Sequence, residues 1–320
     1  MKFVVYGQQG RLGVIQGDRI LDLALAAHAG GTVADDGEVF TSLLTLIEAG
    51  DRGLDRVRRL LEQFEATDQP GLHTDLAATH LHPPFPGRRF AFAGGNYAAH
   101  VARGYANRGR PITAEEVYSK TREGKAGGFW VVSPPAGPHS DIPVPNSADG
   151  LFDYEGEVAV VLGKGGKRLS ADRWENRVWG TTLVIDWSIR SHTEIAFQAP
   201  FYAHKNFDNS KSIGPWITVD EVDPNCCEVE TRVNGQVRQR FNSRDMIHSF
   251  GELLEQISED LTLLPGDVLS GGTGPGTAVD STIADPDGHL PLDLFLKAGD
   301  IVEVTSPHLG SLQARIVASA

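Results

Sequence analysis

Two glutamates placed two positions apart are the first chemically informative feature of this 320-residue chain. Glu155 and Glu157 lead into Val158–Leu162, an apolar run that is typical of a buried strand. Strand side chains alternate between two faces, so both carboxylates lie on one side, about 7 Å apart along the strand. Carboxylates shielded from water repel each other unless a cation lies between them. The spacing therefore indicates a divalent metal site, with an exposed edge strand as the alternative.

A third acid and a base follow at the end of another apolar segment. Asp186 closes the run Thr181–Ile185, and Arg190 comes four positions later. An Asp in that position often begins a turn, so by itself it does not define a ligand. Arg190 could hold a substrate carboxylate with two parallel hydrogen bonds, or it could pair with a neighbouring acid. Both interpretations of Arg190 are open from the sequence.

Six ordered segments connect these residues to a known family. They closely resemble the fumarylacetoacetate hydrolase family over roughly residues 88–320, and they are Asp-Tyr-Glu-Gly-Glu-Val at 153–158, Asp-Trp-Ser-Ile-Arg at 186–190, Lys-Asn-Phe-Asp at 205–208, Gly-Pro-Trp-Ile at 214–217, Val-Asn-Gly-Gln at 233–236 and Leu-Leu-Pro-Gly-Asp-Val at 263–268. The resemblance implies one Mg²⁺ or Mn²⁺ per subunit, bound by Glu155, Glu157 and Asp186. A set of oxygen ligands without Cys suits these hard cations rather than Zn²⁺.

The same resemblance implies two catalytic residues. His100 in Asn-Tyr-Ala-Ala-His at 96–100 corresponds to the family's general base, which acts on the attacking water. Imidazole suits this task because it exchanges protons near neutral pH. Lys205 corresponds to the lysine that helps to hold a developing oxyanion near the metal. Tyr97, Arg190 and Thr273 are the expected substrate-binding residues, and the glycine-rich loop around Thr273 lacks the lysine of a phosphate-binding loop.

The chain also departs from the family pattern. Many members carry a Glu three residues after the histidine to orient it, and this chain has Arg103 there. The partner of His100 could be Glu115, Glu116 or an acid in the carboxyl-terminal half. The family's Asp and Gln after the arginine are replaced by a run that includes His192, so the substrate contacts expected there are in question.

The elements that must position these residues are mainly β. The 36 glycines and 18 prolines are spread along the chain and separate many short strands. The expected strands and helices do not alternate, which argues against a parallel doubly wound sheet. Asn234-Gly235 predicts a two-residue hairpin turn. We expect a mainly β (α+β) fold with a small α+β amino-terminal domain at 1–82. A catalytic domain of the family's mixed β-sandwich roll type follows at 83–320, with a lid insertion at 103–128.

Composition excludes several classes of function. With 29 basic and 42 acidic residues, the net charge of −13 disfavours nucleic acid as a partner. Apolar runs long enough to span a membrane are missing from the sequence, as is a signal peptide, which predicts a cytoplasmic protein without a membrane partner. The two cysteines, Cys226 and Cys227, are neighbours and cannot form a disulfide framework or a zinc finger. The resemblance adds an expected homodimer.

The expected activity is metal-dependent hydrolysis of a C–C bond in an acylpyruvate-type 2,4-dioxo acid, through a metal-bound enolate. The alternative keeps the metal and the enolate but makes the chain a dehydratase, decarboxylase or isomerase of a 2-oxo acid, such as a 2-keto-3-deoxy sugar acid. A non-catalytic binding protein is a third hypothesis, because a fold does not fix a function. The joint presence of the three acids with His100 and Lys205 argues against it.

Overall fold

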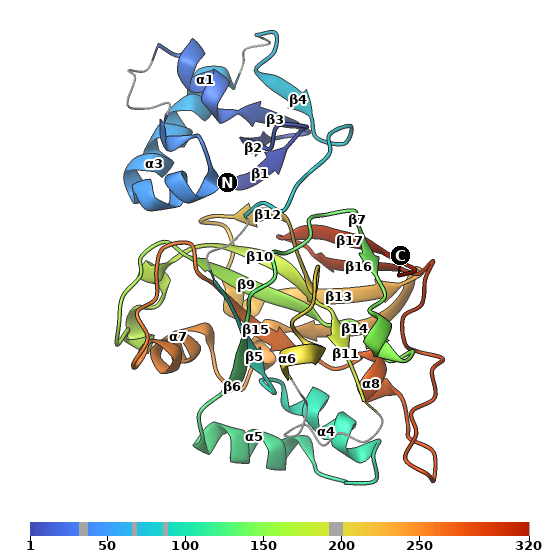
Figure 1. The fold of residues 1–320 in the computed structure, drawn as a ribbon. Coiled ribbons are helices and arrows are strands. Elements are labelled where there is room, and N and C mark those ends of the chain that lie inside the picture. The colour runs from blue at the N-terminus through green and yellow to red at the C-terminus, as the bar shows by residue number, and fades with distance from the viewer. Residues whose placement is uncertain (32–37, 66–68, 86–88, 192–200, 320) are drawn as a thin grey trace.

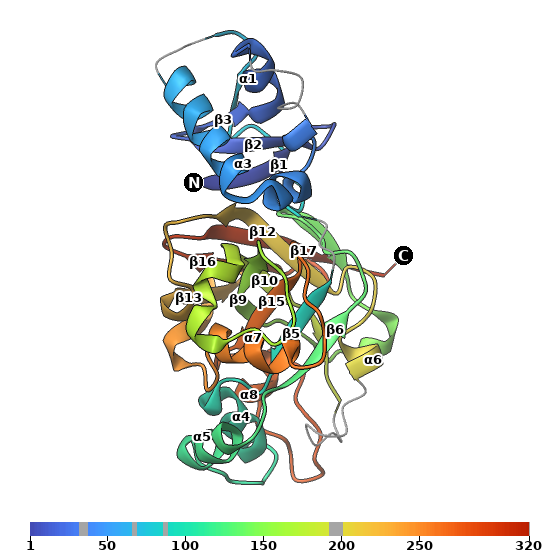
Figure 2. The same cartoon turned by 90° about the vertical axis from the view of Figure 1, so that its left-hand side faces the viewer.

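The computed structural model describes residues 1–31, 38–65, 69–85, 89–191 and 201–319. Figure 1 shows a β-rich body with the amino-terminal unit at one end and helices α4 and α5 at the other. Figure 2, turned by 90°, shows the same elongated arrangement. No helix within the described ranges is both long and apolar enough to cross a membrane.

A ten-stranded sheet runs through the molecule, in the order β4-β3-β2-β1-β12-β10-β9-β15-β5-β6. Its pairs are antiparallel except for the parallel pair of β15 and β5. The strands in chain order are β1 (Lys2–Tyr6), β2 (Arg11–Gln16), β3 (Arg19–Asp22), β4 (His73–Asp75), β5 (Phe90–Gly94), β6 (Gly127–Val131), β9 (Gly156–Leu162), β10 (Val178–Asp186), β12 (Lys211–Thr218) and β15 (Val268–Thr273).

A five-stranded sheet packs against one face of the large sheet and forms a sandwich with it. Its order is β14-β13-β16-β17-β7, with β7 (Ser140–Pro143), β13 (Glu228–Val233), β14 (Gln236–Asn242), β16 (Ile301–Ser306) and β17 (Gly310–Val317). The expected hairpin joins β13 and β14, and both Asn234 and Gly235 have the positive φ that such a turn requires. A short pair, β8 (Phe152–Asp153) and β11 (Ser188–Ile189), lies beside the site described below.

Strand β9 is buried on both faces because two apolar clusters cover it. Val158 and Val160 point into the cluster between the two sheets. Ala159 and Val161 point into a second cluster on the opposite face, which also contains side chains of the amino-terminal helices. This alternation means that Glu157, two positions before Ala159, belongs to the second face.

The helices cover the ends and one face of the large sheet. They are α1 (Leu23–Ala29), α3 (Leu43–Phe64), α4 (Ala98–Ala106), α5 (Ala114–Glu123), α6 (Phe201–His204), α7 (Phe250–Ser258) and α8 (Ala278–Ser281). Apolar residues at helical spacing predict two helices, Phe40–Ala49 and Leu54–Gln63, with a break at Gly50-Asp51. The structure joins them in the single kinked α3, whose backbone leaves helical geometry at Gly50. The mainly β, α+β fold expected from the sequence is confirmed.

The amino-terminal unit is joined to the body through backbone pairing. Strand β1 pairs with β12, with Lys2 opposite Thr218 and Phe3 opposite Ile217. Phe3 and Ile217 also belong to the same apolar cluster. The first strands of the chain therefore extend the sheet whose central strands carry the acidic residues.

Candidate metal and proton-transfer site

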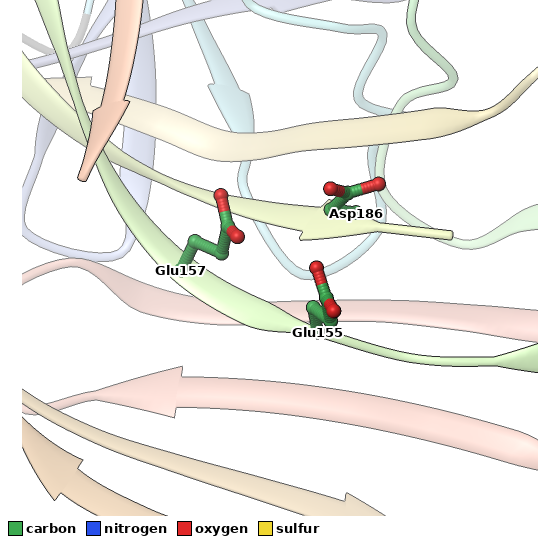
Figure 3. A group of neighbouring side chains, drawn as sticks. All are labelled: Glu155, Glu157 and Asp186. Atoms are coloured by element: carbon green, nitrogen blue, oxygen red, sulfur yellow. The ribbon is translucent and has the colours of Figure 1, made fainter. Parts of the chain in front are cut away.

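Three acidic side chains meet where β9 and β10 come together, and Figure 3 shows their carboxylates turned toward a common space. Glu157 lies opposite Val184 in the antiparallel pair, and the backbone N–H of Asp186 donates to the carbonyl oxygen of Glu155 at 2.9 Å. The register therefore brings Asp186 to the face that carries both glutamates. One ligand atom from each residue lies within 4.8 Å of the others, and all three residues are buried.

The charges around Glu155 and Glu157 shift the pKa values of the two glutamates in opposite directions. Burial raises the pKa of Glu157 well above its ordinary range, and the nearby charges of Asp186 and Glu155 add to the rise. Burial acts in the same direction on Glu155, but the positive charges of Arg190 and Lys205 outweigh it and hold that pKa well below its usual range. Glu155 is therefore ionised, while Glu157 holds a proton more readily.

Two buried lysines neutralise Asp186. The Nζ atom of Lys205 donates to Glu155 at 2.7 Å, to Asp186 at 2.8 Å and to the hydroxyl of Ser188 at 2.6 Å. Lys211 lies opposite Asp186 in β12, and its Nζ is 2.8 Å from the second carboxylate oxygen, an ion pair without hydrogen-bond geometry. Burial lowers the pKa of Lys211, whereas Asp186 and Glu155 outweigh burial and raise the pKa of Lys205.

The three carboxylates fit a divalent cation by the chemistry of their atoms. Among the described residues, Glu155, Glu157 and Asp186 form a group whose oxygens are close enough to share one ion, and neither Cys nor His belongs to it. Hard oxygen ligands favour Mg²⁺ or Mn²⁺ over Zn²⁺. The ammonium group of Lys205 already bridges Glu155 and Asp186, so this space accommodates positive charge.

The guanidinium group of Arg190 forms hydrogen bonds with two neighbouring acids. Its Nε donates to Asp153 at 2.9 Å, and its Nη2 donates to Glu155. Both acids hold the pKa of the buried guanidinium above its ordinary value against the effect of burial. Of the two interpretations left open by the sequence, the pairing with neighbouring acids is observed, and contact with a substrate carboxylate remains a prediction.

His100 finds its partner in the carboxyl-terminal half of the chain. It lies in the first turn of α4, and its Nδ1 is 2.8 Å from the carboxylate of Asp280 on α8. The backbone N–H of Gly276 donates to both carboxylate oxygens of Asp280, at 2.9 and 3.0 Å, and fixes their orientation. The alternatives Glu115 and Glu116 do not fill this role: Glu116 caps the start of α5, and both side chains are exposed.

A cavity of about 1130 Å³ contains both groups. His100, Glu155, Glu157, Asp186, Arg190, Lys205 and Thr273 all line it. Tyr97, in contrast, is buried against Phe241 and is not among the described lining residues, so its expected contact with substrate stays a prediction. His192 lies outside the described residues.

One wall of the cavity comes from the segment expected to act as a lid. The loop after α4 and the end of α5 line it through Arg108, Arg110, Lys120 and Lys125. Helix α5 is tied to α7 by an ion pair between Arg122 and Glu252 at 2.5 Å, and a second ion pair joins Lys125 and Glu259, just beyond the ends of the two helices. Opening this wall would break these contacts, and a lid function of residues 103–128 remains a prediction.

Sequence reasoning missed three polar residues of the site. Ser270 donates to Glu157, Lys211 contacts Asp186, and Asp280 holds His100. Ser270 and Lys211 lie on strands adjacent to the acids, at positions that only the strand register reveals. Asp280 is separated from His100 by 180 positions, and its one local signal is Thr277, which caps the helix that contains Asp280.

The mixed β sandwich thus carries three buried carboxylates and a histidine–aspartate pair, and comparison with known proteins identifies the family that has this fold. The sequence profile described as fumarylacetoacetate (FAA) hydrolase, C-terminal, matches residues 89–317. The chain therefore belongs to the fumarylacetoacetate hydrolase family, as the ordered segments predict. The enzymes of this family with which it compares include hydrolases, isomerases and tautomerases.

Relatives resemble the chain over nearly its full length. An oxaloacetate tautomerase, YisK, of Bacillus subtilis is 29% identical over 309 residues, which cover 95% of this chain and 94% of the relative. A mitochondrial oxaloacetate tautomerase of Bos taurus is 30% identical over 92% of this chain and 87% of its own. The crystal structure of maleylpyruvate hydrolase from Sphingobium sp. SYK-6 with manganese(II) and pyruvate has the same fold, with a TM-score of 0.71, 22% identity and complete coverage of both chains.

Proposed function

We propose that the protein is a metal-dependent hydrolase that cleaves a C–C bond in an acylpyruvate-type 2,4-dioxo acid. The observation that carries this proposal is the shared cavity: the three carboxylates and His100, whose ring is held by Asp280, line one open cavity. The combination provides a site for a cation and a proton-transfer group for the same substrate. The manganese and pyruvate held by the maleylpyruvate hydrolase of the same fold support this combination.

Glu155, Glu157 and Asp186 would hold Mg²⁺ or Mn²⁺. When bound, such a cation supplies Lewis-acid chemistry, which polarises the oxygens of a 2-oxo acid and stabilises the negative charge of an enolate. Lys205, which bonds to two of the three acids, lies where it adds positive charge for a developing oxyanion. Arg190, fixed by its two acidic partners, offers its remaining N–H groups to the carboxylate of the substrate.

His100 would act as the general base on water. Because Asp280 accepts a hydrogen bond from Nδ1, the neutral imidazole presents Nε2 as its proton acceptor. A water molecule held by Nε2 could then attack the distal carbonyl group, and the proton returns when the C–C bond breaks. The aspartate keeps the ring oriented, so this pair would replace the Glu that many family members place three residues after the histidine.

The outer part of the cavity favours a substrate with a second anionic group. Beyond the acidic triad and its cationic partners, the described lining residues include four bases, Arg108, Arg110, Lys120 and Lys125, and one acid, Asp285; Lys125 also pairs with Glu259 outside the cavity lining. This local excess of positive charge occurs in a chain with a net charge of −13. A cleft lined by charge of one sign concentrates ligands of the other sign. We therefore place dicarboxylic acylpyruvates above monocarboxylic ones as substrates.

Tautomerisation of a 2-oxo dicarboxylate such as oxaloacetate is the second candidate function. Oxaloacetate tautomerases that align over more than nine-tenths of this chain favour it. The reaction requires a base that moves a proton between carbon and oxygen, and His100 could do this without an attacking water. The same metal and anion contacts would serve both reactions.

A substrate panel distinguishes these reactions. Purified protein is incubated with Mg²⁺ or Mn²⁺ and with acetylpyruvate, maleylpyruvate, fumarylpyruvate or oxaloacetate, and products are followed by NMR. Two fragments indicate hydrolysis, enol–keto interconversion alone indicates tautomerisation, and release of CO₂ indicates decarboxylation.

A substitution of His100 tests whether this residue is the general base of the reaction. We expect His100→Asn to lower kcat about 10²–10⁴-fold, because it removes the general base. The exposed His139→Asn, a matched control away from the cavity, should leave kcat unchanged. No reaction with any member of the panel, or an active H100N variant, would contradict the proposed function.

A further inference from the structure

The carboxylate of Asp153 connects the two halves of the site. The residue is fully buried, and its side chain accepts four hydrogen bonds. One oxygen accepts from the backbone N–H groups of Tyr154 and Ala278, both at 2.8 Å. The other accepts from the backbone N–H of Val279 at 3.1 Å and from Nε of Arg190 at 2.9 Å. Its acceptor capacity is therefore occupied on both sides.

These bonds lead in two directions. Arg190, held by Asp153, bonds to Glu155 and so reaches the acidic triad. Ala278 and Val279 form the first turn of α8, the same short helix that presents Asp280 to His100. A helix of four residues has little stability of its own, so its position depends on such contacts.

We propose that Asp153 is a positioning residue that sets the placement of the His100–Asp280 pair relative to the metal-binding carboxylates. It does not line the cavity among the described residues, and it acts through Arg190 on one side and through α8 on the other. Tyr154 supports the same turn, because its hydroxyl donates to the carbonyl oxygen of Gly276. The inference rests on the proposed function for its kinetic consequence, and its structural consequence can be measured without turnover.

Asp153→Asn is an informative variant because it preserves the shape of the side chain. Each carboxylate oxygen accepts one N–H of α8, so an amide nitrogen in either position faces a donor with another donor. Asp267→Asn is the matched control. Asp267 is also buried and accepts bonds from an arginine, Arg89, and from the backbone N–H of Leu264, but it does not line the cavity.

The first measurement is a proton NMR spectrum of the metal-free protein. A histidine N–H hydrogen-bonded to a carboxylate gives a downfield signal, and the signal of His100 is assigned by its loss in His100→Asn. We expect Asp153→Asn to shift or abolish this signal and Asp267→Asn to preserve it. Both substitutions should lower the free energy of unfolding relative to wild type, because each changes a buried, hydrogen-bonded carboxylate. An unchanged signal in D153N would overturn the proposal.

The second measurement is a double-mutant cycle on kcat with the substrate identified by the panel. We expect Asp153→Asn to lower kcat about 10–100-fold, as loss of an outer partner of a metal site does. In the Asp280→Asn background the same change should cost less than threefold, because the histidine has already lost its orientation. Fully additive effects would overturn the proposal.

If D153N does not fold, Ala278→Pro removes one donor at the first position of α8, where proline is tolerated, and leaves the charge of Asp153 in place. It should shift the His100 signal in the same way. If wild-type protein turns over none of the panel, the proposed function fails while the NMR comparison still decides the role of Asp153.

Discussion

Glu157 is the residue on which the metal assignment can be tested most cleanly. It accepts a hydrogen bond from Ser270, whereas Glu155 and Asp186 each contact buried cations. Burial and the neighbouring negative charges of Asp186 and Glu155 raise its pKa. A glutamine in its place therefore removes a ligand without creating a buried charge that lacks a partner.

For Glu157→Gln we predict that the metal-free protein keeps its thermal stability, while stabilisation by Mn²⁺ disappears. In wild type, Mn²⁺ at 100 times its Kd should add about 2.7 kcal/mol of stability by mass action. Thermal unfolding with and without Mn²⁺ measures both effects. Glu303→Gln is a matched control, because Glu303 also accepts from a serine hydroxyl, that of Ser311, at 2.7 Å. Equal stabilisation of E157Q and wild type by Mn²⁺ would refute the assignment.

Site residues that are close together in the sequence could be predicted from it, whereas residues that only the fold brings together could not. The spacing of Glu155 and Glu157 follows from strand alternation, so both could be found from the residues alone. Asp186 required the family resemblance, because its place beside them depends on the pairing of β9 with β10. Asp280 could be found by neither route, since the helix that carries it meets α4 through tertiary packing.

Helix α5 is the element whose attachment shapes the cavity wall. Arg122 at its end pairs with Glu252 of α7, and Nε2 of His248 donates to the carbonyl oxygen of Thr121 at 3.1 Å. The hydrogen bond from Arg122, working against burial, lowers the pKa of Glu252 from its ordinary value of 4.5 to about 2. A carboxyl group with a depressed pKa stabilises the fold above the ordinary pKa and loses that contribution as the pH falls through the depressed value.

We therefore predict a pH-dependent stability difference between wild type and Glu252→Gln. The variant keeps the capping interaction at the start of α7 but loses the charge. Because solvent screens this half-exposed pair, the difference should be about 0.5–1 kcal/mol at pH 7. It should narrow below pH 4.5 and vanish near pH 2. Thermal unfolding across this range is the measurement, and a difference that does not depend on pH would speak against the ion pair.

Elements with a strong local signal agree with the sequence. The Asn234-Gly235 hairpin and the break at Gly50 follow from backbone preferences of single residues. The order of strands within the sheets was not predictable in the same way, because β15 pairs in parallel with β5, which lies far from it in the chain.

On the scale of the whole molecule, the amino-terminal unit and the catalytic sheet share one apolar cluster. Phe3, Leu46 and Val57 from the first part of the chain pack in the same cluster as Phe92 and Val161. The domain boundary expected between residues 82 and 83 therefore separates two parts of the chain that bury each other's apolar side chains. Burial of apolar surface is the main stabilising contribution to such an arrangement.

We predict that a fragment starting at residue 83 does not fold on its own, because one face of its central sheet would be exposed. Expression of residues 83–320 should give aggregated protein, while the full chain is soluble and unfolds cooperatively. A soluble fragment with a cooperative transition and Mn²⁺ binding would show that the amino-terminal unit is dispensable for the fold.

The homodimer expected from the family resemblance stays a prediction, and light scattering on the full chain tests it by measuring the molar mass in solution.

Exchange of the C3 protons of pyruvate for deuterium in D₂O tests most directly whether this site uses a divalent cation to form an enolate from a 2-oxo acid. The measurement reports enolate formation whichever bond the natural substrate breaks. We predict that wild-type protein with Mg²⁺ catalyses the exchange, and that removal of Mg²⁺ or the Glu157→Gln substitution abolishes it. Absence of exchange in wild type, or equal exchange in E157Q, would contradict the claim.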